Sequence, residues 1–146
     1  MRPLADVPED LTARLTQLLA ETRPAGTISA YLFGSHAEQR AHRESDVDIA
    51  VLLDRAAHPS ADARFRERVR LSTWLAAELG ASMVDVVVLN DVPPGLASHI
   101  VTKGIRVYCG SAEVDHAFRR DVQLRAADLE PFLRRMRRLK LTALAR

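Results

Sequence analysis

Residues 34–53 read GSHAEQRAHRESDVDIAVLL, and this stretch holds the features that decide the fold. The apolar run from Ile28 to Phe33 ends at Gly34, and a second apolar run, Val47 to Leu53, closes the stretch. Short apolar runs bounded by glycine or polar residues are typical of buried strands. We therefore predict two buried strands joined by a polar loop that begins with Gly34-Ser35.

The rest of the chain alternates between helical and strand patterns. We expect helices at 8–23, 59–79, 96–103 and 112–141, and further strands at 83–89 and 105–109. The order α-β-β-α-β-α-β-α predicts a mixed α/β or α+β domain with a small sheet flanked by helices. Pro131 lies within the last helical stretch, which is therefore either two helices or one kinked helix.

The two longest predicted helices each have a set of apolar residues that we expect to face the core. Over 59–79 these are Phe65, Val69, Leu71, Leu75 and Leu79. Over 112–141 they are Val114, Phe118, Val122, Leu129, Leu133 and Met136. Apolar residues that recur at roughly helical spacing predict a buried stripe.

The length of 146 residues suits one domain, 1–146, in which 112–146 is a helical C-terminal extension. We expect no signal peptide and no membrane span, because no long uncharged apolar run occurs. Cys109 is the sole cysteine, which excludes an internal disulfide and fits a cytoplasmic protein.

The net charge of +2 is unevenly spread. Residues 117–146 contain nine Lys or Arg and three Asp or Glu, a net charge of +6, so the remainder carries −4. This asymmetry indicates either a basic interaction surface near the C-terminus or a solvated helix face. Direct nucleic-acid binding is disfavoured, because Phe118 and Phe132 are the aromatics there and fit the apolar stripe better than a stacking platform.

Asp46 and Asp48 stand at the start of the second predicted strand. Alternate residues of a strand point to the same face, so both carboxylates project together while Val47 and Ile49 point into the core. Paired carboxylates suit a hard divalent cation such as Mg²⁺, which is usually held by one or two carboxylates and substrate phosphates. The alternative is a pair of aspartates at a strand end that face water.

Ten residues, His36 to Ser45, separate Gly34-Ser35 from Asp46, which gives the pattern G-S-x10-D-x-D. Glycine lets a backbone approach a ligand closely, and a helix that began at Ser35 would turn free N–H groups toward an anion. The Ser35 hydroxyl could also contact a phosphate oxygen. A plain strand-to-helix turn with a serine cap is the alternative.

Asp85 interrupts the apolar run Met83 to Leu89. A charge within a buried strand needs a partner or a metal ion. If this strand lies beside the second one, Asp85 joins Asp46 and Asp48 in one metal site. The alternative is a salt bridge to a nearby arginine.

Two stretches of the chain resemble the minimal nucleotidyltransferases of the DNA polymerase β superfamily. They are GSHAEQRAHRESDVDIAVLL at residues 34–53 and VDVVVLN at residues 84–90. Within that superfamily the chain is similar to MntA-type antitoxins, which pair with HEPN ribonuclease toxins. The resemblance covers about residues 10–140 and includes Ile100 to Tyr108, which looks like the family's helix-glycine-strand-tyrosine segment. It departs at Glu38 and Gln39, where the family often carries a basic residue and a glycine.

The resemblance implies a polymerase-β-like fold and two-metal phosphoryl transfer. Asp46 and Asp48 would bind two Mg²⁺ or Mn²⁺ ions, and Asp85 would assist one of them and orient or deprotonate the nucleophile. Gly34 and Ser35 would bind the phosphates of the ATP substrate.

The implied activity is transfer of AMP from ATP to a tyrosine of a cognate HEPN toxin, with which the protein would form a hetero-oligomer. Two alternatives stay open. One is an antitoxin that neutralises by binding alone. The other is a small-molecule nucleotidyltransferase of the aminoglycoside-resistance type, for which little chain remains to build an acceptor pocket.

Overall fold

The computed structural model describes residues 8–34 and 47–144 of the chain. In these ranges four strands form one mixed sheet in the order β3-β2-β1-β4. β1 (Thr27–Phe33) is antiparallel to β2 (Val47–Leu53) and to β4 (Ile105–Cys109), whereas β3 (Val84–Val88) is parallel to β2. β3 and β4 are therefore the edge strands.

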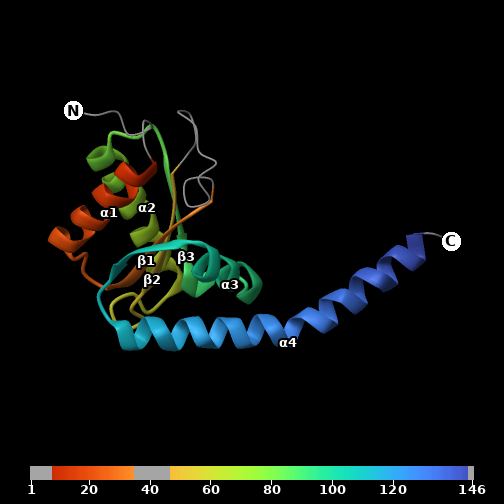
Figure 1. Ribbon diagram of the computed structural model, residues 1–146. Helices are drawn as coiled ribbons and strands as arrows, with labels where there is room; N and C mark the ends of the chain where they lie inside the picture. The colour runs from red at the N-terminus through yellow and green to blue at the C-terminus, as the bar shows by residue number, and fades with distance from the viewer. Residues whose placement is uncertain (1–7, 35–46, 145–146) are drawn as a thin grey trace.

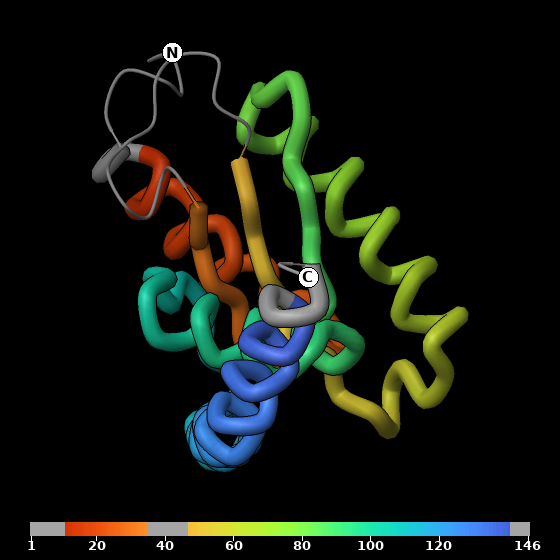
Figure 2. The backbone as a smooth tube through the Cα atoms, turned by 90° about the vertical axis from the view of Figure 1, so that its right-hand side faces the viewer, coloured from red at the N-terminus to blue at the C-terminus, as the bar shows by residue number. Residues whose placement is uncertain are grey.

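Helices cover both faces of this sheet (Figures 1 and 2). α1 (Pro8–Thr22) and α2 (Ala61–Leu79) pack on one face, where their leucines form a core with Val47, Ile49 and Val51. α3 (Pro94–Lys103) and the start of α4 (Ala112–Leu144) pack on the other face, and the short 3-10 helix η2 (Leu89–Asp91) leads from β3 toward α3. The predicted mixed α/β class with a helical C-terminus is confirmed.

The buried face of α2 differs from the prediction. Leu71, Leu75 and Leu79 are buried as expected, but Phe65 is 57 % exposed and Val69 is 50 % exposed. The helical phase of the three leucines instead brings positions 64 and 67 onto the buried face. Arg64 is buried there and donates to both carboxylate oxygens of Asp91, at 3.1 and 2.9 Å, while Glu67 accepts from Arg70.

α4 is a single helix with Pro131 inside it, so of the two expected arrangements the continuous helix is correct. Figure 1 shows it changing direction about halfway along, in the region of the chain that contains the proline. Only its first half packs on the body: Val122 is buried and Phe118 is partly buried against the core. The rest of the predicted stripe is exposed, including Leu129, Leu133 and Met136.

In the ranges that the structure describes, no helix combines the length and the apolar character needed to cross a membrane.

Candidate active site

Gly34 follows the last residue of β1 and lies directly against Asp48. In the antiparallel register Phe33 pairs with Asp48, which brings the end of β1 beside the start of β2. Gly34 has a φ of +75°, and a Cβ added to it would lie 2.5 Å from Oδ2 of Asp48. Any side chain here would therefore both strain the backbone and displace the carboxylate. Glycine therefore suits both the left-handed backbone conformation and the close approach of Asp48.

Asp48 and Asp85 are direct neighbours across the parallel strands β2 and β3. Adjacent strands are roughly 4.8 Å apart, and residues in register point to the same face, so the two carboxylates project side by side. Val47, Ile49, Val84 and Val86 point to the opposite face and are buried in the core. The predicted alternation along β2 is found, and β3 lies beside β2, which is the condition under which the sequence placed Asp85 near Asp48.

Asp85 is not buried, contrary to the reasoning from its apolar neighbours. β3 is an edge strand, and the Asp85 side chain is 50 % exposed. It also forms the salt bridge that the sequence left open as an alternative, because Nη2 of Arg68 lies 3.6 Å from its Oδ1. A long, half-exposed pair of this kind contributes little to stability. Arg68 therefore balances the charge of Asp85 without enclosing it, and the carboxylate remains accessible to a ligand.

Ser35 and Asp46 lie outside the described residues, as do Glu38 and Gln39. In the part of the chain that the structure describes, no group of three or more His, Cys, Asp or Glu side chains forms a metal site. The arrangement of Gly34, Asp48 and Asp85 is thus described, and the full set of three carboxylates with the serine stays a prediction.

A buried polar network, which the sequence reasoning missed, fixes α4 to the sheet. Asp115, in the first turn of α4, is fully buried and accepts hydrogen bonds from Ser29 Oγ and Tyr31 Oη, each at 2.6 Å. Arg106 Nη1 donates to its second oxygen at 2.9 Å, and Arg119 Nη1 donates to Tyr31 Oη at 3.3 Å. Ser29 and Tyr31 could have indicated this network in the sequence, because two hydroxyls on one face of an otherwise apolar strand need a buried hydrogen-bond partner.

This network makes the stability of the fold sensitive to alkaline pH. Burial, followed by the hydrogen bond to Asp115, raises the pKa of Tyr31 from 10.0 to about 12. The unfolded chain loses the phenol proton at lower pH than the folded chain, so this contribution is complete below pH 10 and is lost as the pH rises toward 12. We expect the free energy of unfolding of Tyr31→Phe to fall less over this interval than that of the wild type.

Urea denaturation of both proteins at about pH 9 and about pH 11 measures the difference. Other ionisable groups are shared by the two proteins and cancel in the comparison. Equal losses of stability would contradict the account of Tyr31.

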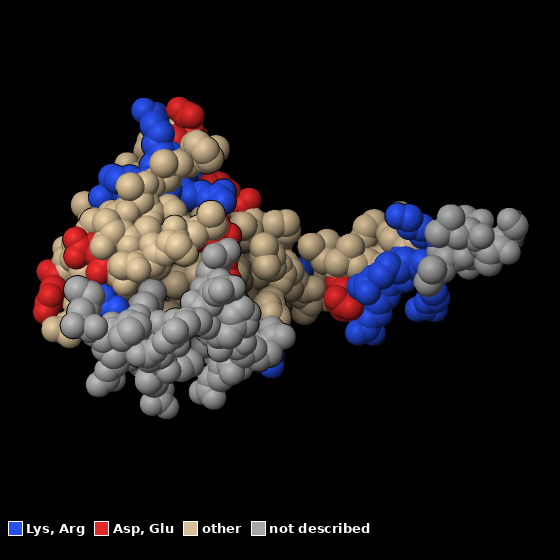
Figure 3. Space-filling view, turned by 90° about the horizontal axis from the view of Figure 1, so that it is seen from above, with Lys and Arg blue, Asp and Glu red and all other residues tan. Residues whose placement is uncertain are grey.

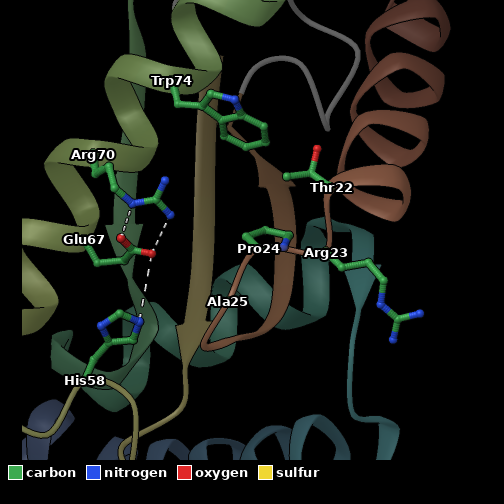
Figure 4. A pocket seen from close by; sticks show the side chains of 8 residues that line it. All are labelled: Thr22, Arg23, Pro24, Ala25, His58, Glu67, Arg70 and Trp74. Carbon is green, nitrogen blue, oxygen red and sulfur yellow. Dashed lines mark hydrogen bonds and ion pairs between the residues drawn. The ribbon is translucent and has the colours of Figure 1, made fainter.

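A cleft of about 560 Å³ lies away from the carboxylates (Figure 4). It opens beside the start of β1, the opposite end of that strand from Gly34, and its lining includes Trp74, His58, Glu67 and Arg70. The Arg70 guanidinium donates to both oxygens of Glu67, at 2.5 and 2.7 Å, and His58 Nε2 lies 3.9 Å from the same carboxylate. Glu67 thus pairs with Arg70 and lies near His58, and the size of the cleft alone does not make it the reaction centre.

Comparisons with known proteins identify the family of this chain. The family "Polymerase beta, Nucleotidyltransferase" matches residues 15–113. The chain is 36 % identical over 109 residues to the protein adenylyltransferase MntA of Shewanella oneidensis, covering 72 % of this chain and 69 % of that protein.

Solved structures show the same similarity. A toxin-antitoxin crystal structure with AMP-PNP contains a chain 27 % identical to this one, with a TM-score of 0.62, covering 92 % of this chain and 98 % of that one. An MntA-HepT toxin-antitoxin structure matches at 25 % identity with a TM-score of 0.57, covering 94 % and 99 %. The resemblance inferred from the sequence is confirmed: the chain belongs to the polymerase β nucleotidyltransferase family and is similar to MntA antitoxins.

Proposed function

We propose that this protein transfers AMP from ATP to a tyrosine hydroxyl of a cognate HEPN ribonuclease toxin and thereby acts as its antitoxin. The observation that carries the proposal is the juxtaposition of Gly34, Asp48 and Asp85 at one end of the sheet. The similarity to the protein adenylyltransferase MntA, and to chains crystallised with toxins, supports the class of reaction and of acceptor.

The described residues fit a divalent metal. Asp48 and Asp85 offer neighbouring carboxylates on one face, and oxygen ligands of this type suit Mg²⁺ or Mn²⁺. Asp46, two residues before Asp48, would complete the set. When bound, two such ions supply charge neutralisation for the triphosphate and lower the pKa of the attacking hydroxyl.

The chain's own residues would position the two reactants. Gly34 has no side chain between the backbone and Asp48, so the backbone after β1 can approach the β- and γ-phosphates, and the Ser35 hydroxyl would donate to one of their oxygens. Asp85 would orient the tyrosine hydroxyl and accept its proton. The tyrosine oxygen then bonds to the α-phosphorus of ATP while the bond to the β-phosphate oxygen breaks and pyrophosphate leaves.

Arg68 has a supporting position in this scheme. Its Nη2 lies 3.6 Å from Oδ1 of Asp85 on the edge of the sheet. Because the contact is made to Oδ1, the Oδ2 atom can turn toward the acceptor hydroxyl and take its proton. We therefore regard Arg68 as a positioning residue.

The test uses the toxin, Mg²⁺ and ATP labelled with ³²P at either the α- or the γ-phosphate. AMP transfer predicts that label reaches the toxin from α-labelled ATP and not from γ-labelled ATP. Mapping of the labelled peptide should place the label on tyrosine. Label from the γ-position would identify a kinase reaction instead, and no label from either would remove the transferase function toward this acceptor.

Nucleotide binding should also depend on divalent metal. A triphosphate that approaches Asp48 and Asp85 meets like charges until a cation lies between them. We expect ATP to bind at least about tenfold more weakly in EDTA than in Mg²⁺, measured by calorimetry. Equal affinity in the two buffers would contradict the assignment of the carboxylates as metal ligands.

A further inference from the structure

Residues 129–140, which make up most of the second half of α4, extend away from the body of the molecule (Figure 1). We call this segment the α4 arm. Its large apolar side chains are exposed, each between 41 and 59 %: Leu129, Phe132, Leu133, Met136 and Leu139. Phe132 and Leu133 are adjacent, and the others follow at steps of three, so all five lie along one face of the helix, which we call the apolar seam.

The apolar seam continues the face that the first half of α4 buries. Val122, Leu129 and Met136 are seven residues apart, so they lie on nearly the same side of the helix. Val122 is 5 % exposed and packs in the core with residues of α3, whereas Leu129 and Met136 lie farther along α4 and are 41 and 49 % exposed. One continuous apolar face of α4 is thus buried against the domain along the first half of the helix and exposed along the second half.

Exposed apolar residues in this arrangement need a partner. A projecting helical segment of about a dozen residues gains little stability from its own backbone hydrogen bonds and is normally held by packing of its apolar face. A contiguous apolar patch on a soluble domain marks an interaction site. Repeats of three and four residues are the pattern with which one helix packs on another.

The charge of the α4 arm indicates which partner fits. It carries five Lys or Arg residues and one acidic residue, Glu130, a net charge of +4. Oxygen Oε1 of Glu130 lies 3.1 Å from Arg134 and 3.8 Å from Arg137, so it is already shared between two cations. Figure 3 shows the cations gathered on the projecting part of the molecule. A second copy would bring two such arms together and be repelled, whereas a surface with carboxylates would be attracted.

We propose that the α4 arm is the docking element for the toxin, and that its apolar seam packs against a helix of the toxin flanked by carboxylates. This inference rests on the proposed antitoxin function. The arginines beside the apolar seam suit such flanks, because a guanidinium pairs with a carboxylate through two parallel hydrogen bonds. Docking through the arm holds the acceptor independently of the nucleotide, so complex formation needs neither ATP nor Mg²⁺.

The test compares two leucine substitutions in the full chain. Leu133→Glu places a charge in the apolar seam. Leu124→Glu makes the same change on the same helix but away from the apolar seam, at a side chain that is 61 % exposed. Binding to immobilised toxin is measured by biolayer interferometry without ATP. We expect Leu133→Glu to raise the dissociation constant at least about tenfold and Leu124→Glu to change it less than about twofold.

Charge reversal supplies a second measurement. The combined substitutions Arg134→Glu, Arg135→Glu, Arg137→Glu and Arg138→Glu should slow association and reduce its dependence on salt, because the arginines steer an acidic partner. All these side chains are exposed, so the thermal midpoints should stay near that of the wild type.

Three results would overturn the inference. The first is toxin binding unchanged in Leu133→Glu, or absent in the wild type. The second is a wild-type dimer in light scattering that Leu133→Glu dissociates without an effect on toxin binding, which would make a second copy the occupant. The third is that the wild type binds vesicles of anionic phospholipid and Leu133→Glu does not, while the two proteins bind the toxin equally well. Binding is read without ATP, so a toxin that docks through the arm but receives no AMP would contradict the proposed function alone.

Discussion

Asp48→Asn should abolish AMP transfer while leaving the protein folded. The substitution keeps the shape of the side chain but removes a charged oxygen that we assign to the metal, and it also changes the group against which Gly34 packs. Removal of groups that only support metal ligands lowers metal affinity or activity about 10- to 100-fold. Removal of a ligand itself should therefore lower the rate of transfer by at least about a thousandfold.

The fold should tolerate this change. The asparagine of Asp48→Asn would lie beside Asp85 without adding a second negative charge, so the thermal midpoint should be unchanged or slightly raised. Asp62→Asn is a matched control, because Asp62 is an exposed aspartate of α2 that pairs with Arg66 at 3.3 Å. The control should transfer AMP at the wild-type rate. An Asp48→Asn protein that is active would place the reaction elsewhere, and one that is unfolded would make Asp48 a structural residue.

Asp115→Ala should destabilise the fold more than any other substitution proposed for this protein. The carboxylate is fully buried and accepts from Ser29, Tyr31 and Arg106, so its removal leaves two buried hydroxyls and a guanidinium without their acceptor. Each buried hydroxyl left without its acceptor costs about 1–3 kcal/mol, whereas Arg106, whose side chain is 46 % exposed, regains water, so we expect a total loss of about 2–5 kcal/mol. The start of α4 would lose its attachment to β1 and β4 at the same time.

Urea denaturation at neutral pH measures this loss, and Asp121→Ala is the control. Asp121 also lies on α4, but it is exposed and pairs with Arg125 within the helix at 3.1 Å. We expect the control to change the free energy of unfolding by less than about 1 kcal/mol. A loss of similar size in the two variants would show that the buried network does not fix α4.

Much of the fold follows from local sequence patterns. The alternation of Val47, Asp48 and Ile49 predicts which side chains of β2 enter the core, and the run from Ile28 to Phe33 predicts β1. Ser60 caps α2 by accepting from the backbone N–H of Ala63, and Gly80 ends it with a φ of 65°. These features depend on neighbours within a few residues, and the sequence contains all the information that they require.

Features that depend on distant parts of the chain were predicted less well. Whether Asp85 is buried depends on the place of β3 at the edge of the sheet, which a local apolar pattern cannot specify. The partners of Asp115 include Ser29 and Tyr31, which are 86 and 84 residues away. The exposure of Phe65 is a different case, because the phase of Leu71, Leu75 and Leu79 already placed it off the buried face.

The open half of α4 shows a further limit of sequence patterns. Leu129, Leu133 and Met136 follow the same spacing as Val122, and spacing alone assigns all four to one core. The structure separates them, because the body of the domain ends before the helix does (Figure 1). An apolar stripe predicts burial against something, and the identity of that partner depends on how far the rest of the fold reaches.

The most direct test of the central claim is the intact mass of the toxin, together with its ribonuclease activity, after incubation with this protein, ATP and Mg²⁺. We predict that the mass rises by one or more AMP groups, that ribonuclease activity falls in step, and that the loss persists after the antitoxin is removed. Asp48→Asn should produce neither effect. Ribonuclease inhibition without ATP, at unchanged toxin mass and fully reversed when the antitoxin is removed, would contradict the account and identify neutralisation by binding alone.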